Sequence, residues 1–213
     1  MKRTEKKNVL IVAGEASGDL HGSNLVHAMR GLNSGITVRG IGGKNMEEAG
    51  VGILVPASDV AVVGLTEVLS RLSSIVRAHL KLRSLLKNSP TDLLVLIDFP
   101  DFNISLARTA KRCGVPVLYY ISPQIWAWRG GRIRKIARRV DRMAVILPFE
   151  KEFYLNHGMD VDYVGHPLLD SVPHSLDKGE IVRELELENG RPIVGLLPGS
   201  RCEEIRNLLP TLS

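Results

Sequence analysis

This sequence contains few cysteines and no long apolar run. Only two cysteines, Cys113 and Cys202, occur in 213 residues, and they lie far apart, which argues against a disulfide framework and against a cysteine metal site. Two such cysteines suit a reducing cytoplasm. No uninterrupted stretch of about 18 apolar residues occurs, so no transmembrane helix is expected.

The amino-terminal residues resemble a secretory signal only superficially. A basic segment, 2–7, precedes the apolar run 9–13, as it would in a signal. The run is too short, however, and it leads into residues 14–19 without a cleavage-like segment. It therefore predicts a buried first strand.

The overall composition is that of an ordinary globular protein. Hydrophobic residues make up 44% and charged residues 24%, with no low-complexity stretch and no internal repeat. The length suits one full domain and part of a second. A formal net charge of +5 favours anionic partners but does not choose among phosphates, nucleic acid and an anionic membrane face.

Short apolar runs alternate with longer segments of helical period. Runs rich in Val, Ile and Leu suit parallel strands that are covered on both faces. The predicted strands are 9–13, 37–41, 93–97, 115–121, 142–147 and 161–164, and the predicted helices are 20–30, 44–49, 63–87, 104–113, 132–140 and 149–157. This alternation predicts an α/β fold, a doubly wound parallel sheet in a Rossmann-like domain over residues 1–170.

The pattern changes after residue 164. Residues 171–190 are predicted to form a linker region that includes a charged helix around 177–188. An apolar strand then leads through a Gly-Ser turn into a helix that begins near Glu203. We therefore expect residues 191–213 to start a second Rossmann-like domain, although a single βα unit cannot bury its own apolar face.

The turn after the first strand, residues 14–22, is predicted to face a ligand. Its three glycines allow close backbone approach, and Ser17 or Asp19 can cap the following helix. The spacing matches neither a dinucleotide-binding turn nor a phosphate-binding P-loop. A carboxylate at Glu15 favours sugar hydroxyls over a phosphate. The alternative is a capped turn with no ligand.

Asp98 and Asp101 flank a proline turn at the end of the predicted strand 93–97. Pro100 restricts the residue before it, which leaves Asp98 at the strand end and Asp101 in position to cap the next helix. Asp98 can then accept a proton from a substrate hydroxyl as a general base. The alternative is that Asp98 only binds loop amides.

Two tryptophans, Trp126 and Trp128, follow the predicted strand 115–121 and suit the apolar faces of sugars or acyl chains, or else core packing. The basic segment 129–142 places apolar residues at helical spacing between its cations. It can meet anionic lipid headgroups or simply face water, and no nucleic-acid module accompanies it. The apolar stretch 56–69 suits a mobile flap or a lipid-contacting surface, or else core packing.

Two weaker motifs lie further along the chain. Asp160 and Asp162 match a short metal-binding pattern, but they begin a buried-looking strand, and no metal is expected. Arg201, at the start of a helix after Ser200, can bind a diphosphate bidentately with help from the free amides there.

Six motifs, taken together and in this order, resemble the lipid-A-disaccharide synthase family. They are residues 13–22, 40–43, 98–103, 122–128, 164–168 and 197–201. The resemblance implies an inverting glycosyltransferase of the GT-B type, which has two Rossmann-like domains. It would join UDP-2,3-diacylglucosamine to 2,3-diacylglucosamine 1-phosphate (lipid X) to give lipid A disaccharide 1-phosphate and UDP, in lipopolysaccharide biosynthesis.

The resemblance also implies roles for particular residues and partners. Asp98 is the expected catalytic base, and Ser200 with Arg201 would bind the UDP diphosphate. The expected substrate-binding residues are Gly14, Glu15, Ser17, Gly18, Asp101, Asn103, Gln124, Trp126, Trp128 and His166. No metal or other cofactor and no nucleic acid is expected. The implied location is the cytoplasmic side of a Gram-negative inner membrane, peripherally bound to its anionic surface, with a homodimer left open.

A complete synthase carries a whole second domain that holds most of the UDP-sugar site. These 213 residues alone are therefore expected to catalyse little or nothing. One alternative is a non-catalytic half-domain that binds a lipid or a nucleotide sugar. Another is a UDP-sugar epimerase, which would have no use for two tryptophans beside a basic helix. An NAD(P) oxidoreductase fits least, because the glycine spacing is wrong and Arg39 stands where a ribose-binding acid is expected.

Overall fold

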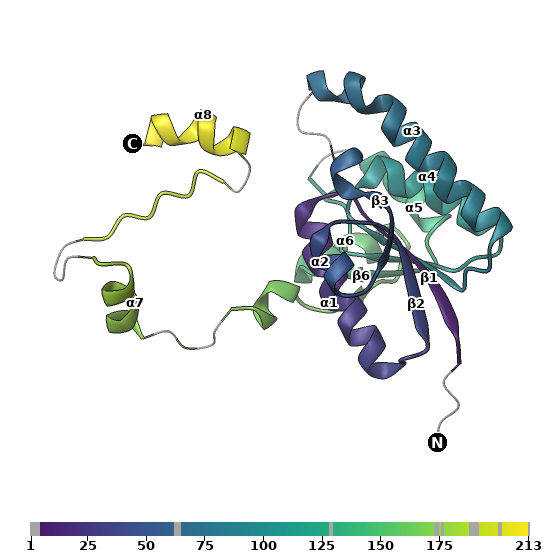
Figure 1. The fold of residues 1–213 in the computed structure, drawn as a ribbon, viewed down its shortest axis with the longest axis horizontal. Helices are drawn as coiled ribbons and strands as arrows, with labels where there is room; N and C mark the ends of the chain where they lie inside the picture. Colours follow the sequence, from purple (N-terminus) through teal and green to yellow (C-terminus); the bar gives the residue numbers. More distant parts are fainter. Residues whose placement is uncertain are drawn as a thin grey trace. The chain divides into compact units, whose positions relative to one another are not determined.

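The computed structural model describes residues 5–61, 65–127, 130–172, 175, 177–187, 192–199 and 202–212, without the side chains of 65–71, 130 and 202–203. The chain divides into two compact units, Met1–Leu169 and Asp170–Ser213. Figure 1 shows the ribbon, coloured from the amino to the carboxyl terminus.

The first unit is built on a sheet of seven parallel strands in the order β3-β2-β1-β4-β5-β6-β7. The strands are β1 Lys7–Ala13, β2 Ile36–Gly42, β3 Gly52–Pro56, β4 Leu93–Ile97, β5 Val117–Tyr120, β6 Arg142–Val145 and β7 Asp162–Tyr163. The predicted α/β fold with a doubly wound parallel sheet is confirmed. Such a sheet needs helices on both faces, because its strands are apolar on both sides.

The helices of this unit are α1 Ala16–Leu32, α2 Lys44–Glu48, α3 Leu65–Asn88, α4 Pro100–Arg112, α5 Ile133–Ala137 and α6 Pro148–Leu155. Short 3₁₀ turns lie at Ala57–Asp59, Gly130–Arg132 and Pro167–Asp170. In Figure 1, α1 and α2 lie beside β1 and β2, and the long α3 runs along α4.

Successive side chains of β1 point to opposite faces of the sheet and define two cores. Leu10 and Val12 belong to the core that also contains Leu82 of α3, Leu106 of α4 and Tyr154 of α6. The other core contains the alternate β1 residues together with parts of α1 and α2, namely Val9, Ile11, Ala13, Val26 and Met46. The unit is thus a three-layer α/β/α arrangement.

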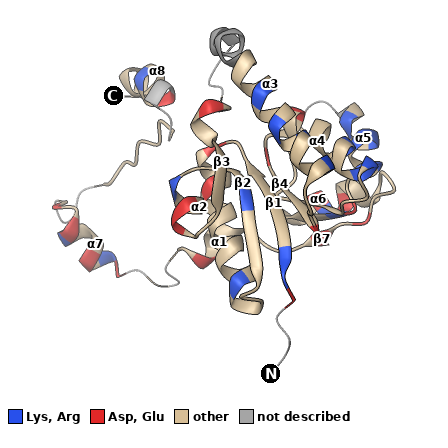
Figure 2. Ribbon diagram, turned by 45° about the vertical axis from the view of Figure 1, so that its right-hand side comes forward, with Lys and Arg blue, Asp and Glu red and all other residues tan. Residues whose placement is uncertain are grey.

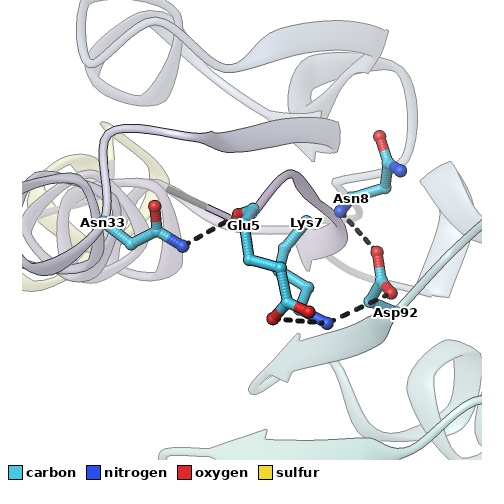
Figure 3. A network of polar contacts seen from close by, with 5 residues as sticks. All are labelled: Glu5, Lys7, Asn8, Asn33 and Asp92. Carbon is cyan, nitrogen blue, oxygen red and sulfur yellow. Dashed lines mark hydrogen bonds and ion pairs between the residues drawn. The ribbon is translucent and has the colours of Figure 1, made fainter. Parts of the chain in front are cut away.

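The amino end of β1 is fixed by a polar network far from the carboxyl ends of the strands. The backbone N–H of Asn8 donates to Asp92 Oδ2 over 2.7 Å, and Lys7 forms ion pairs with Glu5 at 3.3 Å and Asp92 at 4.0 Å. Asn33 Nδ2 donates to the carbonyl oxygen of Glu5 over 3.1 Å (Figure 3). The network connects β1 to the segments that precede β2 and β4.

Two elements of this unit, β3 and α5, differ from the sequence prediction. The edge strand β3 was not predicted, because its residues are at most half-buried and its apolar run is short. Helix α5 covers Ile133–Ala137 instead of 132–140, since the chain must turn to enter β6 at Arg142. In the stretch 56–69, Ala57 and Val60 are buried, which fits core packing, and the side chains of 62–69 lie outside the described residues.

The second unit contains two described helices, α7 Lys178–Glu184 and α8 Cys202–Leu212. The Asp177 side chain caps α7 by accepting a hydrogen bond from the Glu180 N–H at 2.9 Å. The expected strand between the two helices is absent over 192–199, where Leu197 is 92% exposed. The prediction of a strand there is wrong within the described residues, and the start of a second Rossmann-like domain stays a prediction.

Candidate functional site

The chain reverses its direction across the sheet between β1 and β4. From β1 the strands progress outward through β2 to β3, and from β4 they progress the other way to β7. Ala13 and Ile97 are aligned as the last residues of β1 and β4, so the segments that follow them lie side by side. Ligands of open α/β sheets bind at this switch point, outside the carboxyl ends of the strands.

Gly14 and Phe99 are in close contact at the switch point. A Cβ atom on Gly14 would lie 2.6 Å from the Phe99 ring, so only glycine leaves room for the ring in this position. Asp98 and Phe99 both adopt left-handed backbone conformations, with φ values of 43° and 46°. Such values are costly for residues other than glycine and cluster at functional sites.

Asn103 and Tyr119 hold this strained turn in place. Asn103 Nδ2 donates to the carbonyl oxygens of Ile97 at 3.1 Å and Asp98 at 2.6 Å. The Tyr119 hydroxyl also donates to the Asp98 carbonyl, at 2.6 Å. Burial raises the pKa of Tyr119 well above its ordinary value, so this donor keeps its proton. The backbone of Asp98 is therefore fixed, and its side chain is half-buried at the strand end.

Asp101 does not cap α4, and this part of the sequence prediction is wrong. The helix begins at Pro100, with Phe99 as its N-cap and no side-chain capping bond. Proline is well suited to the first position of a helix, which puts Asp101 inside the first turn. Asp101 instead forms an ion pair with Arg132, which ties the first turn of α4 to the start of α5.

Neither Ser17 nor Asp19 caps α1, which begins at Ala16 with Glu15 as its N-cap. Asp19 caps α2 instead. Its carboxylate accepts from the backbone N–H groups of Gly43 at 2.6 Å, Asn45 at 3.0 Å and Met46 at 3.1 Å, and from Asn45 Nδ2 at 2.9 Å. The acid thus joins the turn after β1 to the turn after β2.

The remaining predicted residues of the first turn differ in exposure. Glu15 is half-buried and Ser17 is exposed. Gly18 is buried, and a Cβ there would lie 3.3 Å from that of Ala13, so this glycine allows α1 to pack closely on β1. All three lie at the carboxyl end of β1, beside the Asp98 turn.

His166 approaches α1 from the segment after β7. Its ring centroid lies 6.3 Å from that of the buried His21, in an edge-to-face arrangement. Burial lowers the pKa of His21, and the nearby His166 lowers it further. His166, a predicted substrate-binding residue, therefore stands near the first turns of α1.

Trp126 packs edge-to-face on Phe149, with ring centroids 4.9 Å apart. Trp126 remains 38% exposed and Phe149 47% exposed, so the pair offers aromatic surface beyond the ends of β5 and β6. Gln124 of the same loop is exposed. Phe149 was not among the predicted residues, although its place directly after Pro148 marks the start of α6. Trp128, Ser200 and Arg201 lie outside the described residues.

A buried glutamate that was also not predicted joins the ends of β5 and β6. The Ser122 hydroxyl donates to Glu150 Oε1 at 2.6 Å, and Glu150 Oε2 accepts from the N–H groups of Ile146 at 3.2 Å and Leu147 at 2.9 Å. Burial raises the pKa of the adjacent Tyr154 to about 12. Glu150 makes the glutamate half of a capping box at the start of α6, but Leu147 has no hydroxyl to make the other half, so the sequence carried no complete capping-box signal.

No three His, Cys, Asp or Glu side chains of the described residues come together in a group that could hold a metal ion. No described helix has the length and apolarity that crossing a membrane requires.

The chain is similar to several curated proteins. It is 53% identical to a lipid-A-disaccharide synthase of Geobacter metallireducens over 212 residues, which cover 100% of this chain and 55% of the relative. It is 47% identical to the lipid-A-disaccharide synthase of Coxiella burnetii over 206 residues, with 97% and 55% covered. The chain thus spans about half the length of these relatives.

Solved structures share the fold at low sequence identity. A putative UDP-N-acetylglucosamine 2-epimerase from Listeria monocytogenes superposes with a TM-score of 0.55 at 11% identity, covering 78% of this chain and 51% of that protein. Another UDP-N-acetylglucosamine 2-epimerase gives a TM-score of 0.55 at 12% identity. The family profile described as Lipid-A-disaccharide synthetase matches residues 9–213. The chain belongs to the lipid-A-disaccharide synthetase family.

Proposed function

We propose that this chain supplies the acceptor half of an inverting glycosyltransferase. The complete enzyme would join UDP-2,3-diacylglucosamine to 2,3-diacylglucosamine 1-phosphate and release lipid A disaccharide 1-phosphate and UDP. The observation that carries the proposal is the position of Asp98, a half-buried carboxylate at the β1/β4 switch point, in a chain of this family.

In the proposed reaction, Asp98 accepts the proton of the acceptor 6-hydroxyl as that oxygen attacks the anomeric carbon of the donor sugar. The bond from that carbon to the UDP oxygen breaks, and attack from the opposite side inverts the configuration. Ser200 and Arg201 would stabilise the departing diphosphate, the arginine through paired N–H bonds. The three bonds around the Asp98 backbone support this role, because a base must be held in position.

The sugar and acyl groups would be bound by residues around the same turns. Glu15, Gln124 and His166 have polar side chains suited to sugar hydroxyls. The exposed faces of Trp126 and Phe149 suit a sugar ring or an acyl chain. The glycines at 14 and 18 would let the backbone approach the ligand.

We further propose that the protein binds an anionic membrane surface peripherally. In Figure 2, Lys and Arg residues gather on α4 and α5. Helix α3 also exposes three apolar side chains spaced four residues apart, which form an apolar stripe on its surface. They are Leu72 (49% exposed), Val76 (47%) and Leu80 (55%). Cations near an anionic surface contribute about 1 kcal/mol each.

The activity test compares the 213-residue chain alone with the same chain joined to the carboxyl-terminal half of the Geobacter metallireducens relative. Both are incubated with donor and acceptor in detergent micelles, and disaccharide and UDP are measured. We expect product from the joined protein, none from its Asp98→Asn variant, and parent-like rates from a control variant at an exposed acid, Asp160→Asn. Lipid or nucleotide-sugar binding without turnover in the joined protein would favour a non-catalytic half-domain. Full activity in Asp98→Asn would refute the assignment of the base.

A further inference from the structure

A cavity of about 210 Å³ lies between α4 and α5, on the side of α4 that meets the basic segment. It is lined by Asp101, Ile104, Ser105, Arg132, Lys135 and Arg139. Its volume is far above the roughly 15 Å³ that holds one water molecule, so it has room for a small ligand. Three of its six lining side chains are cationic and one is anionic.

The single carboxylate does not neutralise these cations. Asp101 forms an ion pair with Arg132, whose side chain is only 17% exposed, and this fixes one wall of the cavity. Among the described residues, Lys135 and Arg139 have no ion-pair partner. The cavity therefore keeps an excess of positive charge.

Arg139 is held in place by the backbone. Its Nη1 donates to the carbonyl oxygen of Ile104 at 2.9 Å, which leaves other guanidinium N–H groups for a ligand. Burial lowers the pKa of Arg139, and the neighbouring Arg108 and Arg112 lower it further. The surroundings of this guanidinium are thus positive, and a bound anion would relieve the repulsion.

We propose that this cavity is a binding site for a phosphate monoester. A dianion would accept hydrogen bonds from Lys135, Arg139 and the Ser105 hydroxyl, and Arg132 would remain paired with Asp101. The arginine guanidinium, which can donate two parallel hydrogen bonds, and the lysine ammonium are the side-chain groups that bind phosphate most effectively. The Asp101 carboxylate on one wall would repel a large polyanion, so the cavity suits a single compact phosphate group.

The cavity adjoins the Asp98 turn through α4. Asp101 is in the first turn of that helix, and Arg132 acts electrostatically on Tyr119, whose hydroxyl binds the Asp98 carbonyl. A sugar phosphate or a lipid phosphate bound here would therefore be held close to the switch point. Only the assignment of this phosphate to the acceptor sugar rests on the proposed function.

The test uses the 213-residue chain and two kinds of probe. Inorganic phosphate and glucosamine 1-phosphate are titrated in solution while backbone amide NMR signals are followed. Phosphatidylcholine vesicles that contain either phosphatidic acid, a monoester, or phosphatidylglycerol, a diester, are used in sedimentation assays. Saturable signal shifts at residues 101–105 and 132–139 would support a site for free or sugar phosphates, and a preference for phosphatidic acid alone would support a lipid headgroup site.

Variants separate this site from diffuse surface charge. Lys135→Gln and Arg139→Gln should each weaken binding about tenfold, as expected for one charge-assisted contact. Arg138→Gln is the matched control, an exposed cation next to Arg139 that does not line the cavity, and it should change affinity less than twofold. Because Arg139 also holds the Ile104 carbonyl, Lys135→Gln is the decisive variant if Arg139→Gln unfolds.

Three results would overturn the proposal. The first is that Arg138→Gln weakens phosphate binding as much as Lys135→Gln does. The second is equal binding to vesicles with phosphatidic acid and with phosphatidylglycerol, without any binding of the soluble phosphates. The third is that no probe binds saturably. None of these readouts depends on glycosyl transfer. A failed phosphate site and a failed transferase assignment are therefore distinguishable.

Discussion

The Tyr119 hydroxyl donates to the main-chain carbonyl of Asp98 over 2.6 Å, and so a buried residue of β5 holds the turn at the end of β4. The proposed base is thereby supported by the neighbouring strand as well as by its own helix, through Asn103. The turn is part of the packed domain, and its geometry depends on side chains that never need to touch a ligand.

Tyr119→Phe should remove this support at small cost to folding. The Asp98 carbonyl retains the Asn103 bond, so we expect the free energy of unfolding to fall by about 1 kcal/mol, the net value of one hydrogen bond. In the chain joined to the carboxyl-terminal half of the relative, the rate of glycosyl transfer should fall by more than the loss of folded protein explains. The change should be mainly in kcat. Urea unfolding and steady-state kinetics measure the two effects, and an unchanged kcat would contradict the positioning role.

Gly14→Ala should disturb the switch point directly. The added methyl group would lie 2.6 Å from the Phe99 ring, so the ring or the strained turn must move, at a cost of about 1 to 3 kcal/mol. Gly31→Ala is the control, because an added methyl group there meets no atom within 4 Å and the residue lies in α1. The free energy of unfolding of Gly31→Ala should rise by up to about 1 kcal/mol. Urea unfolding of both variants checks the pair, and equal stabilities would argue against the contact.

Asp19→Ala should destabilise the unit by about 2 kcal/mol. The change leaves the amino end of α2 without the carboxylate that accepts its backbone N–H groups. Ser17→Ala alters an exposed side chain of the same helix and should stay within about 0.5 kcal/mol of the parent. Thermal or urea unfolding is the measurement. If Asp19→Ala leaves the free energy of unfolding nearly unchanged, the cap contributes little to stability.

The stability of the protein should fall as the pH drops below 6.5. The folded state holds the pKa of His21 below its ordinary value of 6.5, mainly through burial, so the unfolded chain binds the proton more readily. The contribution of His21 to the free energy of unfolding is fully present above pH 6.5 and is lost as the pH falls toward the folded-state pKa. His21→Gln should make this slope shallower, and burial also lowers the pKa of His79, which contributes the part that remains. Identical slopes in the parent and His21→Gln would contradict the prediction.

The parts of the fold that could be predicted from the sequence are those that depend on local pattern. Strands β1 and β4 are continuous apolar runs, and both end abruptly in residues of the candidate site. The α/β alternation then determines which strand ends share an edge of the sheet. The edge strand β3 escaped prediction because its half-buried residues give no comparable signal.

Other features could not be predicted because they depend on partners distant in sequence. Asp19 was expected to cap its own helix, but its partners lie more than twenty residues further along the chain. Asp101 was expected at an N-cap, and the start of α4 at Pro100 gave it Arg132 as a partner instead. In both cases the residue type suggested a polar contact, and only the packing of the elements decided which one.

The left-handed pair Asp98 and Phe99 has a consequence for the kinetics of association. Folding itself fixes this turn, through Gly14, Asn103 and Tyr119, before any ligand arrives. A ligand that meets the turn has no backbone to order there, so the entropy loss of binding is correspondingly smaller. Encounter at this edge of the sheet should therefore proceed in a single fast phase, without a slow step of loop closure.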